Sequence, residues 1–194
     1  MSLYLTYPKS DMTGVILAGG RGSRMGNKDK GLVVWRGKAL YQHVLSRLAP
    51  QTDKVCISAN RNIMIYQQSG LPVIADSIPG FAGPLAGMLA ALKYIDTEWA
   101  AFTPCDSPLL PPDLVARLWH ARLAAPAVWP CTEEGDHPAM ALLNAGLAGQ
   151  LERFLARGGR RVKLFLEQAG GHAVSFDGST GAFMNINGPD NLSP

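Results

Sequence analysis

A glycine-rich segment with several cations is the clearest sign of chemistry in this 194-residue chain. It reads LAGGRGSRMG over 17–26, and Lys30 follows within the short motif DKG at 29–31. Glycines let a backbone turn its N–H groups toward a phosphate at close range, and arginine and lysine side chains bind phosphate oxygens. We therefore predict a triphosphate site here, while a surface loop with solvated charges is the alternative. The glycines are Gly19, Gly20, Gly22 and Gly26, and the cations are Arg21, Arg24 and Lys30.

Two better-known phosphate motifs do not fit this part of the chain. A dinucleotide-binding fingerprint requires G-x-G-x-x-G, but counting from Gly20 the last glycine position holds Met25. A P-loop requires G-x-x-x-x-G-K-[ST]. Around the Gly-Lys pair at 37–38, Leu32 takes the place of the first glycine and Ala39 that of the hydroxyl residue. The broken fingerprint disfavours a dehydrogenase.

Asp106 follows an apolar segment at 99–102, within the sequence TPCDSP at 103–108. If that segment is a strand of a parallel sheet, the aspartate lies at the edge where such sheets bind ligands. Magnesium keeps several waters and needs only one or two protein carboxylates to be held against phosphate oxygens. An aspartate before Ser-Pro is also typical of a turn, which is the alternative. Combined with the glycine-rich segment, the pattern predicts Asp106 as a Mg²⁺ ligand.

Polar residues follow two further predicted strands and could contact a nucleobase. Ser58 and Asn60 lie in SANR at 58–61, and Asp76 lies in ADS at 75–77. Guanine presents its N1–H and N2–H₂ donors side by side, and a carboxylate such as Asp76 could accept both, whereas adenine and cytosine do not offer that pair. Asp76 is therefore a candidate for contacting guanine, and a turn role is the alternative.

Two more segments have the features of ligand-binding positions. Gly83 and Gly87 lie in GPLAG at the start of a predicted helix, whose free N–H groups could meet an anion. An ordinary helix start with close packing at Gly87 is the alternative. Asn185 and Asn187 alternate with apolar residues, so both could face one side of a strand and read the donor and acceptor edge of a ring. Turn chemistry before a Gly-Pro pair is the alternative there.

Short apolar segments alternate with helical patterns through the first two thirds of the chain. The alternation predicts an α/β fold with a mostly parallel central sheet and helices on both faces, in one domain over 1–194. We expect strands at 14–17, 32–35, 55–57, 73–74, 99–102, 127–129, 139–143, 174–176 and 183–184. We expect helices at 41–48, 62–68, 84–92, 111–123, 151–155 and 162–166.

The glycine-rich segment followed by DKG resembles the opening of the nucleotidyltransferases that activate sugars, alditols and cofactors with a nucleoside triphosphate. One branch, the molybdenum cofactor guanylyltransferases, is similar to this chain nearly end to end. The matching pieces are the opening segment, ANR at 59–61, Asp76-Ser77, GPLAGM at 83–88, Cys105-Asp106, His137-Pro138 and Asn185-Ile186-Asn187. The chain departs from that pattern at Ser58, where the branch commonly has asparagine in an N-x-N motif that contacts the nucleotide.

The resemblance implies a Rossmann-like sheet, a Mg²⁺-dependent transfer with loss of pyrophosphate, GTP as donor and molybdenum-loaded molybdopterin as acceptor. It places the triphosphate on Leu17, Ala18, Gly19, Gly20 and Arg21 and gives Arg24 and Lys30 phosphate contacts. It agrees with Asp106 as the magnesium ligand. It places acceptor binding at Gly83, Gly87, Asn185 and Asn187, and at the basic run Arg157, Arg160 and Arg161. A solvated helix face is the alternative for that run. Proteins of molybdenum cofactor biosynthesis and delivery would be its partners.

The expected reaction is an in-line displacement, with Lys30, Arg24 and Asp106 as the catalytic residues. The terminal phosphate of molybdopterin attacks the α-phosphorus of GTP, and pyrophosphate leaves. One rival is another nucleotidyltransferase that uses CTP or acts on a sugar phosphate. A second rival is a non-catalytic GTP-binding or cofactor-carrying protein, since one fold serves many functions.

The bulk composition fits a globular enzyme that handles small polyanions. Apolar residues make up 47% and charged residues 17%, which allows a sizeable core and excludes disorder. The net charge of +3 falls short of the dense basic face of a nucleic-acid binder. An odd number of cysteines without a C-x-x-C motif predicts buried, reduced thiols at Cys56, Cys105 and Cys131. No segment has the length of a membrane span, and we expect a cytoplasmic location.

Overall fold

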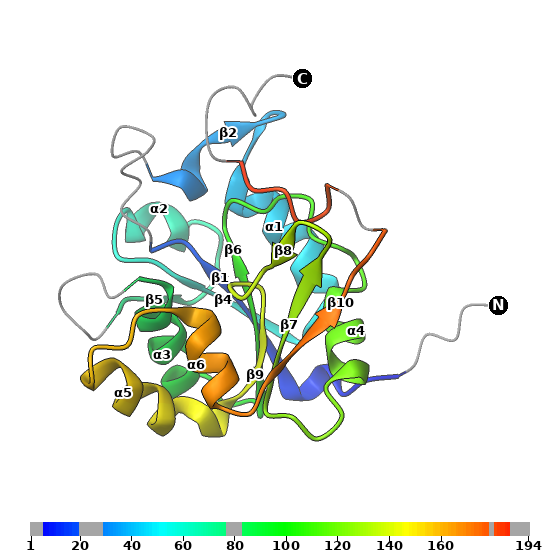
Figure 1. Ribbon diagram of the computed structural model, residues 1–194. Helices are drawn as coiled ribbons and strands as arrows, with labels where there is room; N and C mark the ends of the chain where they lie inside the picture. The colour runs from blue at the N-terminus through cyan, green and yellow to red at the C-terminus, as the bar shows by residue number, and fades with distance from the viewer. Residues whose placement is uncertain (1–5, 20–28, 77–82, 179–180, 187–194) are drawn as a thin grey trace.

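The computed structural model describes residues 6–19, 29–76, 83–178 and 181–186 (Figure 1). Within these residues the centre of the molecule is an eight-stranded sheet in the order β10-β7-β9-β6-β1-β4-β5, with β8 paired to β7. Its strands are β1 (Met12–Leu17), β4 (Lys54–Ser58), β5 (Val73–Ile74), β6 (Trp99–Pro104), β7 (Ala127–Thr132), β8 (Gly135–Asp136), β9 (Leu142–Asn144) and β10 (His172–Ser175). A separate hairpin consists of β2 (Val34–Trp35) and β3 (Lys38–Ala39).

The sheet is mixed but mostly parallel, which confirms the predicted α/β fold. β1 pairs in parallel with β4 and β6, β4 pairs in parallel with β5, and β10 pairs in parallel with β7. β9 is antiparallel to both of its neighbours, β6 and β7. Only five residues, 137–141, connect β8 to β9. The chain reverses direction at the two-residue turn 133–134 between β7 and β8, and β9 continues along β7 in the direction of β8, so both strands are antiparallel to β7.

Helices cover both faces of this sheet. They are α1 (Leu40–Leu48), α2 (Ile63–Gln67), α3 (Pro84–Tyr94), α4 (Leu114–Ala121), α5 (Ala148–Ala156) and α6 (Val162–Gln168). Short 3₁₀ turns lie at Lys9–Asp11, Lys30–Leu32, Ala49–Gln51 and Ala145–Leu147. One core contains side chains of α1, α2 and α4, and a second core contains side chains of α3, α5 and α6. Figure 1 shows the latter three helices grouped together on their side of the sheet.

The alternation of side chains along the central strands divides the two cores. On β1, Met12 and Ile16 lie in the core with α1 and α4, while Val15 lies in the core with α3. On β4, Ile57 lies in the core with α1 and α4, and Cys56 lies in the core with α3. Successive residues of a strand point to opposite faces, so an unbroken apolar run serves a sheet buried on both sides.

Several sequence-based expectations are corrected by the structure. The expected helix at 111–123 is shorter, because α4 begins at Leu114 after Asp113, which serves as its N-cap. It ends at Ala121, and Leu123 has a left-handed φ of 53° and is 81% exposed. The expected strand at 139–143 begins only at Leu142. Leu32 belongs to a 3₁₀ turn that precedes the hairpin rather than to a strand.

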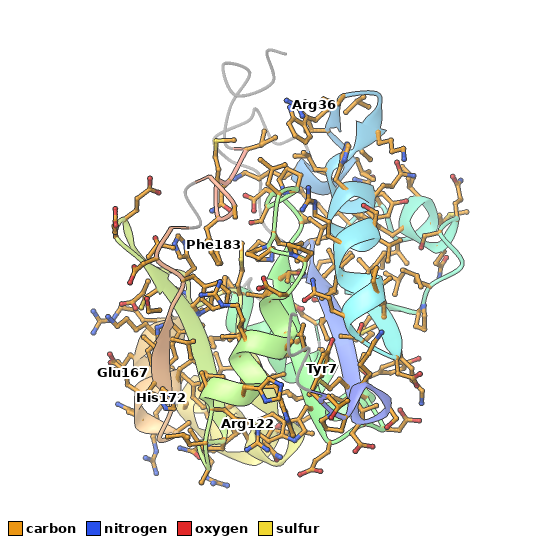
Figure 2. All side chains as sticks on the ribbon, turned by 90° about the vertical axis from the view of Figure 1, so that its right-hand side faces the viewer. Tyr7, Arg36, Arg122, Glu167, His172 and Phe183 are labelled. Atoms are coloured by element: carbon orange, nitrogen blue, oxygen red, sulfur yellow. The ribbon has the colours of Figure 1, made fainter. Side chains whose placement is uncertain are left out.

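The strand expected at 183–184 is also wrong. Among the described residues, 181–183 form a turn and 184–186 have no regular structure. Phe183 is buried, stacked on His137 with ring centroids 4.7 Å apart and in edge contact with Phe176. Ring contacts, rather than ladder hydrogen bonds, therefore fix this segment. Figure 2 shows Phe183 at the opposite end of β7 and β10 from His172.

Each of the three cysteines has a free thiol. Cys56 and Cys105 are buried as expected, but Cys131 is only partly covered, which corrects that part of the expectation. Burial raises the pKa of the Cys56 thiol to about 12, so that thiol stays protonated and unreactive near neutral pH. In the part of the chain that the structure describes, no helix is long and apolar enough to cross a bilayer.

Candidate active site

The segments predicted to bind the nucleotide meet at the carboxyl edge of the parallel strands. Leu17, the last residue of β1, is paired in register with Ser58 of β4 on one side and with Pro104 of β6 on the other. The backbone N–H of Ala18 donates to the Ser58 carbonyl at 2.8 Å, and that of Cys105 donates to the Leu17 carbonyl at 3.0 Å. This shared edge brings the residues after β1, β4 and β6 together.

Lys30 and Asp106 form an ion pair at this edge. The Lys30 Nζ donates to Asp106 Oδ2 at 3.1 Å, across 76 residues of sequence. The two side chains are 23% and 13% exposed, so solvent screens their charges only in part. An ammonium and a carboxylate held together at a strand edge can bind, between them, a phosphate oxygen and the metal that accompanies it.

Asp29, which precedes this lysine, is itself held by side chains from α2 and its N-cap. The Tyr66 hydroxyl donates to Asp29 Oδ1 at 2.6 Å, and Asn62 Nδ2 donates to Asp29 Oδ2 at 3.0 Å. Burial, followed by the hydrogen bond to Asp29, raises the pKa of Tyr66 far above its ordinary value, so the phenol remains a donor. Sequence reasoning missed Tyr66 and Asn62, because nothing local to α2 indicates a contact with Asp29.

Asn60 and Asp76 form a reciprocal pair next to the β4 end. Asn60 Nδ2 donates to Asp76 Oδ2 at 2.7 Å, and the Asp76 backbone N–H donates to Asn60 Oδ1 at 2.8 Å. Asp76 Oδ1 is buried and has no hydrogen-bond partner among the described residues. Burial raises the pKa of Asp76, and the Asn60 hydrogen bond only partly opposes that rise. The amide thus fixes the carboxylate and leaves Oδ1 without a donor among the described residues.

Two glycines leave room for these polar side chains. A Cβ at Gly87 of α3 would lie 2.5 Å from Ser58 Oγ and 3.5 Å from Asp76 Oδ1. A Cβ at Gly19 would lie 3.1 Å from Asn60 Nδ2. Gly83, directly before α3, has a φ of 72° that other residues rarely adopt. Close packing at Gly87, the alternative weighed for the sequence, is therefore confirmed, and it is packing against two predicted nucleotide-binding residues.

Asn185 is held beside Asp106 by a buried serine. The Ser107 hydroxyl donates to Asn185 Oδ1 at 2.6 Å, and the Ile186 N–H donates to the Asp106 carbonyl at 2.9 Å. Because its carbonyl oxygen is occupied, Asn185 keeps its amide NH₂ for other contacts. Ser107 was missed by sequence reasoning, although its place in the TPCDSP segment was a usable signal.

Four of the predicted site residues, Gly20, Arg21, Arg24 and Asn187, lie outside the described residues. Arg157, Arg160 and Arg161 are exposed in the connection between α5 and α6. Arg160 Nη1 donates to the carbonyls of Leu155 and Gly159 at 2.9 and 2.6 Å. The roles of these seven residues, like those of the other predicted site residues, remain predictions.

The donor set around Asp106 fits a magnesium ion that is bound mainly by its substrate. Within the described residues there is no group of three or more His, Cys, Asp or Glu side chains that could hold a metal. Magnesium is commonly bound through one or two carboxylates, with phosphates and waters as its remaining ligands. Asp106 supplies such a carboxylate, and it points to the same edge as Lys30.

The mostly parallel sheet, with the Lys30–Asp106 ion pair at its carboxyl edge, is the arrangement expected of a nucleotidyltransferase. Residues 14–172 match the MobA-like NTP transferase domain. The chain belongs to this family, in the branch of the molybdenum cofactor guanylyltransferases. The family resemblance drawn from the motifs is thereby confirmed.

Named relatives and a solved structure support this assignment. The chain is 51% identical over 177 residues to the molybdenum cofactor guanylyltransferase of Serratia proteamaculans (strain 568), covering 91% of this chain and 90% of the relative. It is 49% identical over 179 residues to that of Yersinia pestis (strain Pestoides F), covering 92% of each. The crystal structure of molybdopterin-guanine dinucleotide biosynthesis protein A from Archaeoglobus fulgidus superposes with a TM-score of 0.76 at 26% identity, covering 93% of this chain and 95% of that chain.

Proposed function

We propose that this guanylyltransferase transfers GMP from GTP to the terminal phosphate of molybdenum-loaded molybdopterin and releases pyrophosphate. The observation that carries this proposal is the Lys30–Asp106 pair at the carboxyl edge of β1 and β6, with Asp76 near the end of the next strand, β4. The names of its relatives identify guanylyl as the group that is transferred and the molybdenum cofactor as the acceptor.

The transfer requires positioning and charge neutralisation more than proton chemistry. An oxygen of the acceptor phosphate forms a bond to the α-phosphorus of GTP, and the bond from that phosphorus to the oxygen bridging to the β-phosphorus breaks. Its electron pair leaves with pyrophosphate. A phosphate dianion is already a nucleophile, so no general base is needed. The ammonium of Lys30 neutralises charge on the leaving pyrophosphate, together with backbone N–H groups after β1 and the predicted contacts of Gly20, Arg21 and Arg24.

Asp106 would hold Mg²⁺ against the phosphates of GTP. When bound there, the ion would polarise phosphate oxygens and offset their negative charge. The protein's own contribution is to keep one carboxylate and one ammonium side by side at the strand edge, 3.1 Å apart in this structure. From its place beside Asp106, the Lys30 ammonium would reach the leaving group by rotation of its flexible stem.

Asp76 is proposed to select guanine. Its Oδ1 has no donor among the described residues, and a buried acceptor without a donor is costly. The N1–H and N2–H₂ groups of guanine are donors of the kind that would relieve that cost. Cytosine offers a single amine next to an acceptor nitrogen, so a CTP-dependent relative gains less from this carboxylate. This observation favours GTP over CTP, the nearest rival.

The acceptor is proposed to bind beside Asp106. Asn185 presents its amide there, and Gly87 brings the start of α3 close to the predicted nucleotide residues. Gly83, directly before α3, is proposed to act with Gly87. Asn187 is proposed to act with Asn185. The three unpaired cysteines suit a reducing compartment, and we propose a cytoplasmic location with biosynthesis and delivery proteins of the cofactor as partners.

Pyrophosphate release tests the proposal directly. Purified protein is incubated with Mg²⁺, molybdenum-loaded molybdopterin and GTP, CTP, ATP or UTP in separate reactions. Release with GTP alone is the expected result. Release with CTP would retain the transfer and overturn the guanine assignment, whereas no release with any nucleotide would contradict catalysis and favour a carrier.

A further inference from the structure

Asp29 is surrounded by hydrogen-bond donors on both carboxylate oxygens. Oδ1 accepts from the Tyr66 hydroxyl at 2.6 Å and from the Gly31 N–H at 3.2 Å, and Oδ2 accepts from Asn62 Nδ2 at 3.0 Å. Hydrogen bonds to a carboxylate are about twice as strong as bonds between neutral groups. Asp29 is therefore firmly held, and the residue that follows it is Lys30.

The two side-chain donors come from α2, which takes no other assigned part in the site. Tyr66 is fully buried, with its ring in edge contact with Tyr41 at a centroid distance of 5.1 Å. Its hydroxyl therefore has a fixed position. Asn62 precedes the helix in a left-handed conformation, φ 51° and ψ 30°, and its side chain does not cap the helix. An asparagine before a helix usually caps it, but here the amide is directed to Asp29.

The fit around the Asp29–Lys30–Gly31 turn is close. A Cβ at Gly31 would lie 2.3 Å from the Tyr66 hydroxyl and 3.4 Å from Cys105 Cβ. The turn is thus confined between α2 and the residue that precedes Asp106. The same turn places Lys30 Nζ at 3.1 Å from Asp106.

We propose that Tyr66 and Asn62 are positioning residues that hold Asp29, and through it keep Lys30 at Asp106. This inference rests on the proposed role of Lys30 in the transfer. The two donors bind the carboxylate of the residue next to the lysine rather than any substrate. α2 thereby has a function in catalysis in addition to its part in the core.

A purely structural role for Tyr66 would give a different pattern. A core residue contributes to folding stability and affects every part of the site alike. A positioning residue affects turnover through one side chain, so its effect disappears once that side chain is gone. A double-mutant cycle with Lys30 separates the two cases.

The test compares Tyr66→Phe in the full chain with wild type and with Tyr41→Phe. Tyr41 is the matched control, because it is the neighbouring buried tyrosine and its hydroxyl makes no hydrogen bond to any described residue. We expect Tyr66→Phe to reduce kcat about tenfold, the scale of one hydrogen bond to a charged group. The KM for the acceptor and the activity of Tyr41→Phe should stay near wild type. Asn62→Ala should act in the same direction.

The cycle adds Tyr66→Phe to Lys30→Ala. We expect the double variant to turn over within about twofold of Lys30→Ala alone, as full coupling requires. An undiminished tenfold effect in the Lys30→Ala background, or wild-type turnover of Tyr66→Phe, overturns the inference while leaving the role of Lys30 intact. Wild-type turnover of Lys30→Ala itself would overturn that role and the inference with it.

A second readout does not depend on turnover. The rate at which an amine-directed reagent modifies Lys30, followed by mass spectrometry, reports how well the lysine is held. Lys54, which is paired with Asp96 at the surface, serves as the internal reference. We expect faster modification of Lys30 in Tyr66→Phe with Lys54 unchanged. Equal rates of Lys30 modification in both proteins would overturn the inference.

Discussion

Lys30 Nζ lies 3.1 Å from Asp106 Oδ2, although 76 residues separate the two along the chain. The lysine belongs to the turn after the glycine-rich segment, and the aspartate follows β6. Because β1 and β6 are adjacent and parallel, both side chains reach the same edge of the sheet. The parallel topology thus brings the two segments to the same edge, and the turn at Asp29 places Lys30 within reach of Asp106.

Replacing either member of this pair by alanine should lower turnover by orders of magnitude. Lys30→Ala removes the cation that offsets charge on pyrophosphate, and Asp106→Ala removes the proposed metal carboxylate; such electrostatic groups each contribute about 100- to 1,000-fold. Initial rates of pyrophosphate release measure the effect. Lys54→Ala is a suitable control, because its pair with Asp96 is exposed and lies outside the site. Near-normal rates in Lys30→Ala or Asp106→Ala would remove that residue from the mechanism.

Asp76→Asn should weaken GTP binding and reduce discrimination against other bases. An amide presents only one acceptor and would place an NH₂ group against the donors of guanine. We expect the KM for GTP to rise about tenfold to 100-fold, the scale of leaving such donors unpaired. Competition between GTP and CTP provides the measurement, with Asp53→Asn, an exposed carboxylate, as control. An unchanged preference for GTP would exclude Asp76 as the base-reading residue.

Asp76→Asn should also differ from wild type in how its GTP affinity and its free energy of unfolding depend on pH. Burial raises the pKa of Asp76 in the folded protein, so wild type should lose GTP affinity on acidification earlier than an ordinary aspartate would. Between the unfolded and folded pKa values the folded state binds more protons, so the free energy of unfolding falls as pH rises through that window. Asp76→Asn should lack both effects and unfold at a higher temperature near neutral pH. Identical pH profiles for both proteins would contradict this assignment.

Gly87→Ala should disturb the nucleotide residues through a specific clash. The new Cβ would lie 2.5 Å from Ser58 Oγ, and its other neighbours are at 3.4 Å or more. We expect a higher KM for GTP and partial recovery in Ser58→Ala/Gly87→Ala, where the clashing oxygen is absent. Steady-state kinetics of the two single variants and the double variant test this. A double variant no better than Gly87→Ala would show that the clash does not explain the defect.

Ser107→Ala should affect the acceptor more than the nucleotide. It removes the donor that fixes Asn185 Oδ1 at 2.6 Å, leaving the amide free to turn. We expect the KM for molybdopterin to rise several-fold, as the loss of one neutral hydrogen bond implies, with little change in the KM for GTP. Ser46→Ala, on the outer face of α1, is the control. Equal effects on both substrates would argue against a role of Asn185 in acceptor binding.

Much of the fold could be predicted from local patterns. The alternation of apolar segments with helical spacing predicts a mostly parallel sheet, and β1, β4 and β5 are parallel as expected. The antiparallel β9 could not be predicted in this way, since its direction follows from the hairpin of β7 and β8, which the apolar segments do not indicate. Phe183 was assigned to a strand because an apolar pair suggests one, whereas the ring of His137 holds it.

Some residues of the candidate site could likewise be predicted from local patterns, and others could not. Asp106 and Asp76 could be found from sequence, because each directly follows a strand and the carboxyl edge is where such sheets bind ligands. Tyr66 could not, since it contacts Asp29 across 37 residues and nothing near it differs from an ordinary core tyrosine. Motifs therefore indicate the residues that face the ligand, but not the residues that hold them in place.

Gly31→Ala offers the sharpest test of the space between Tyr66 and the lysine turn. Its Cβ would lie 2.3 Å from the Tyr66 hydroxyl and 3.2 Å from Tyr66 Cζ, so removal of the hydroxyl relieves most of the clash. We expect Gly31→Ala to lose more turnover than Tyr66→Phe, and Gly31→Ala/Tyr66→Phe to recover to the level of Tyr66→Phe alone. Gly149→Ala in α5, whose nearest neighbour is Arg153 Nη1 at 3.6 Å, should match wild type.

Rates of pyrophosphate release and unfolding temperatures of these variants, measured together, separate displacement of Lys30 from general destabilisation. Recovery of turnover in the double variant without recovery of the unfolding temperature would place the effect at the turn. A double variant less active than Gly31→Ala would contradict the arrangement, because the hydroxyl that obstructs the new methyl group is then gone. Such a result would mean that Gly31 is needed for its backbone rather than for the room it leaves to Tyr66.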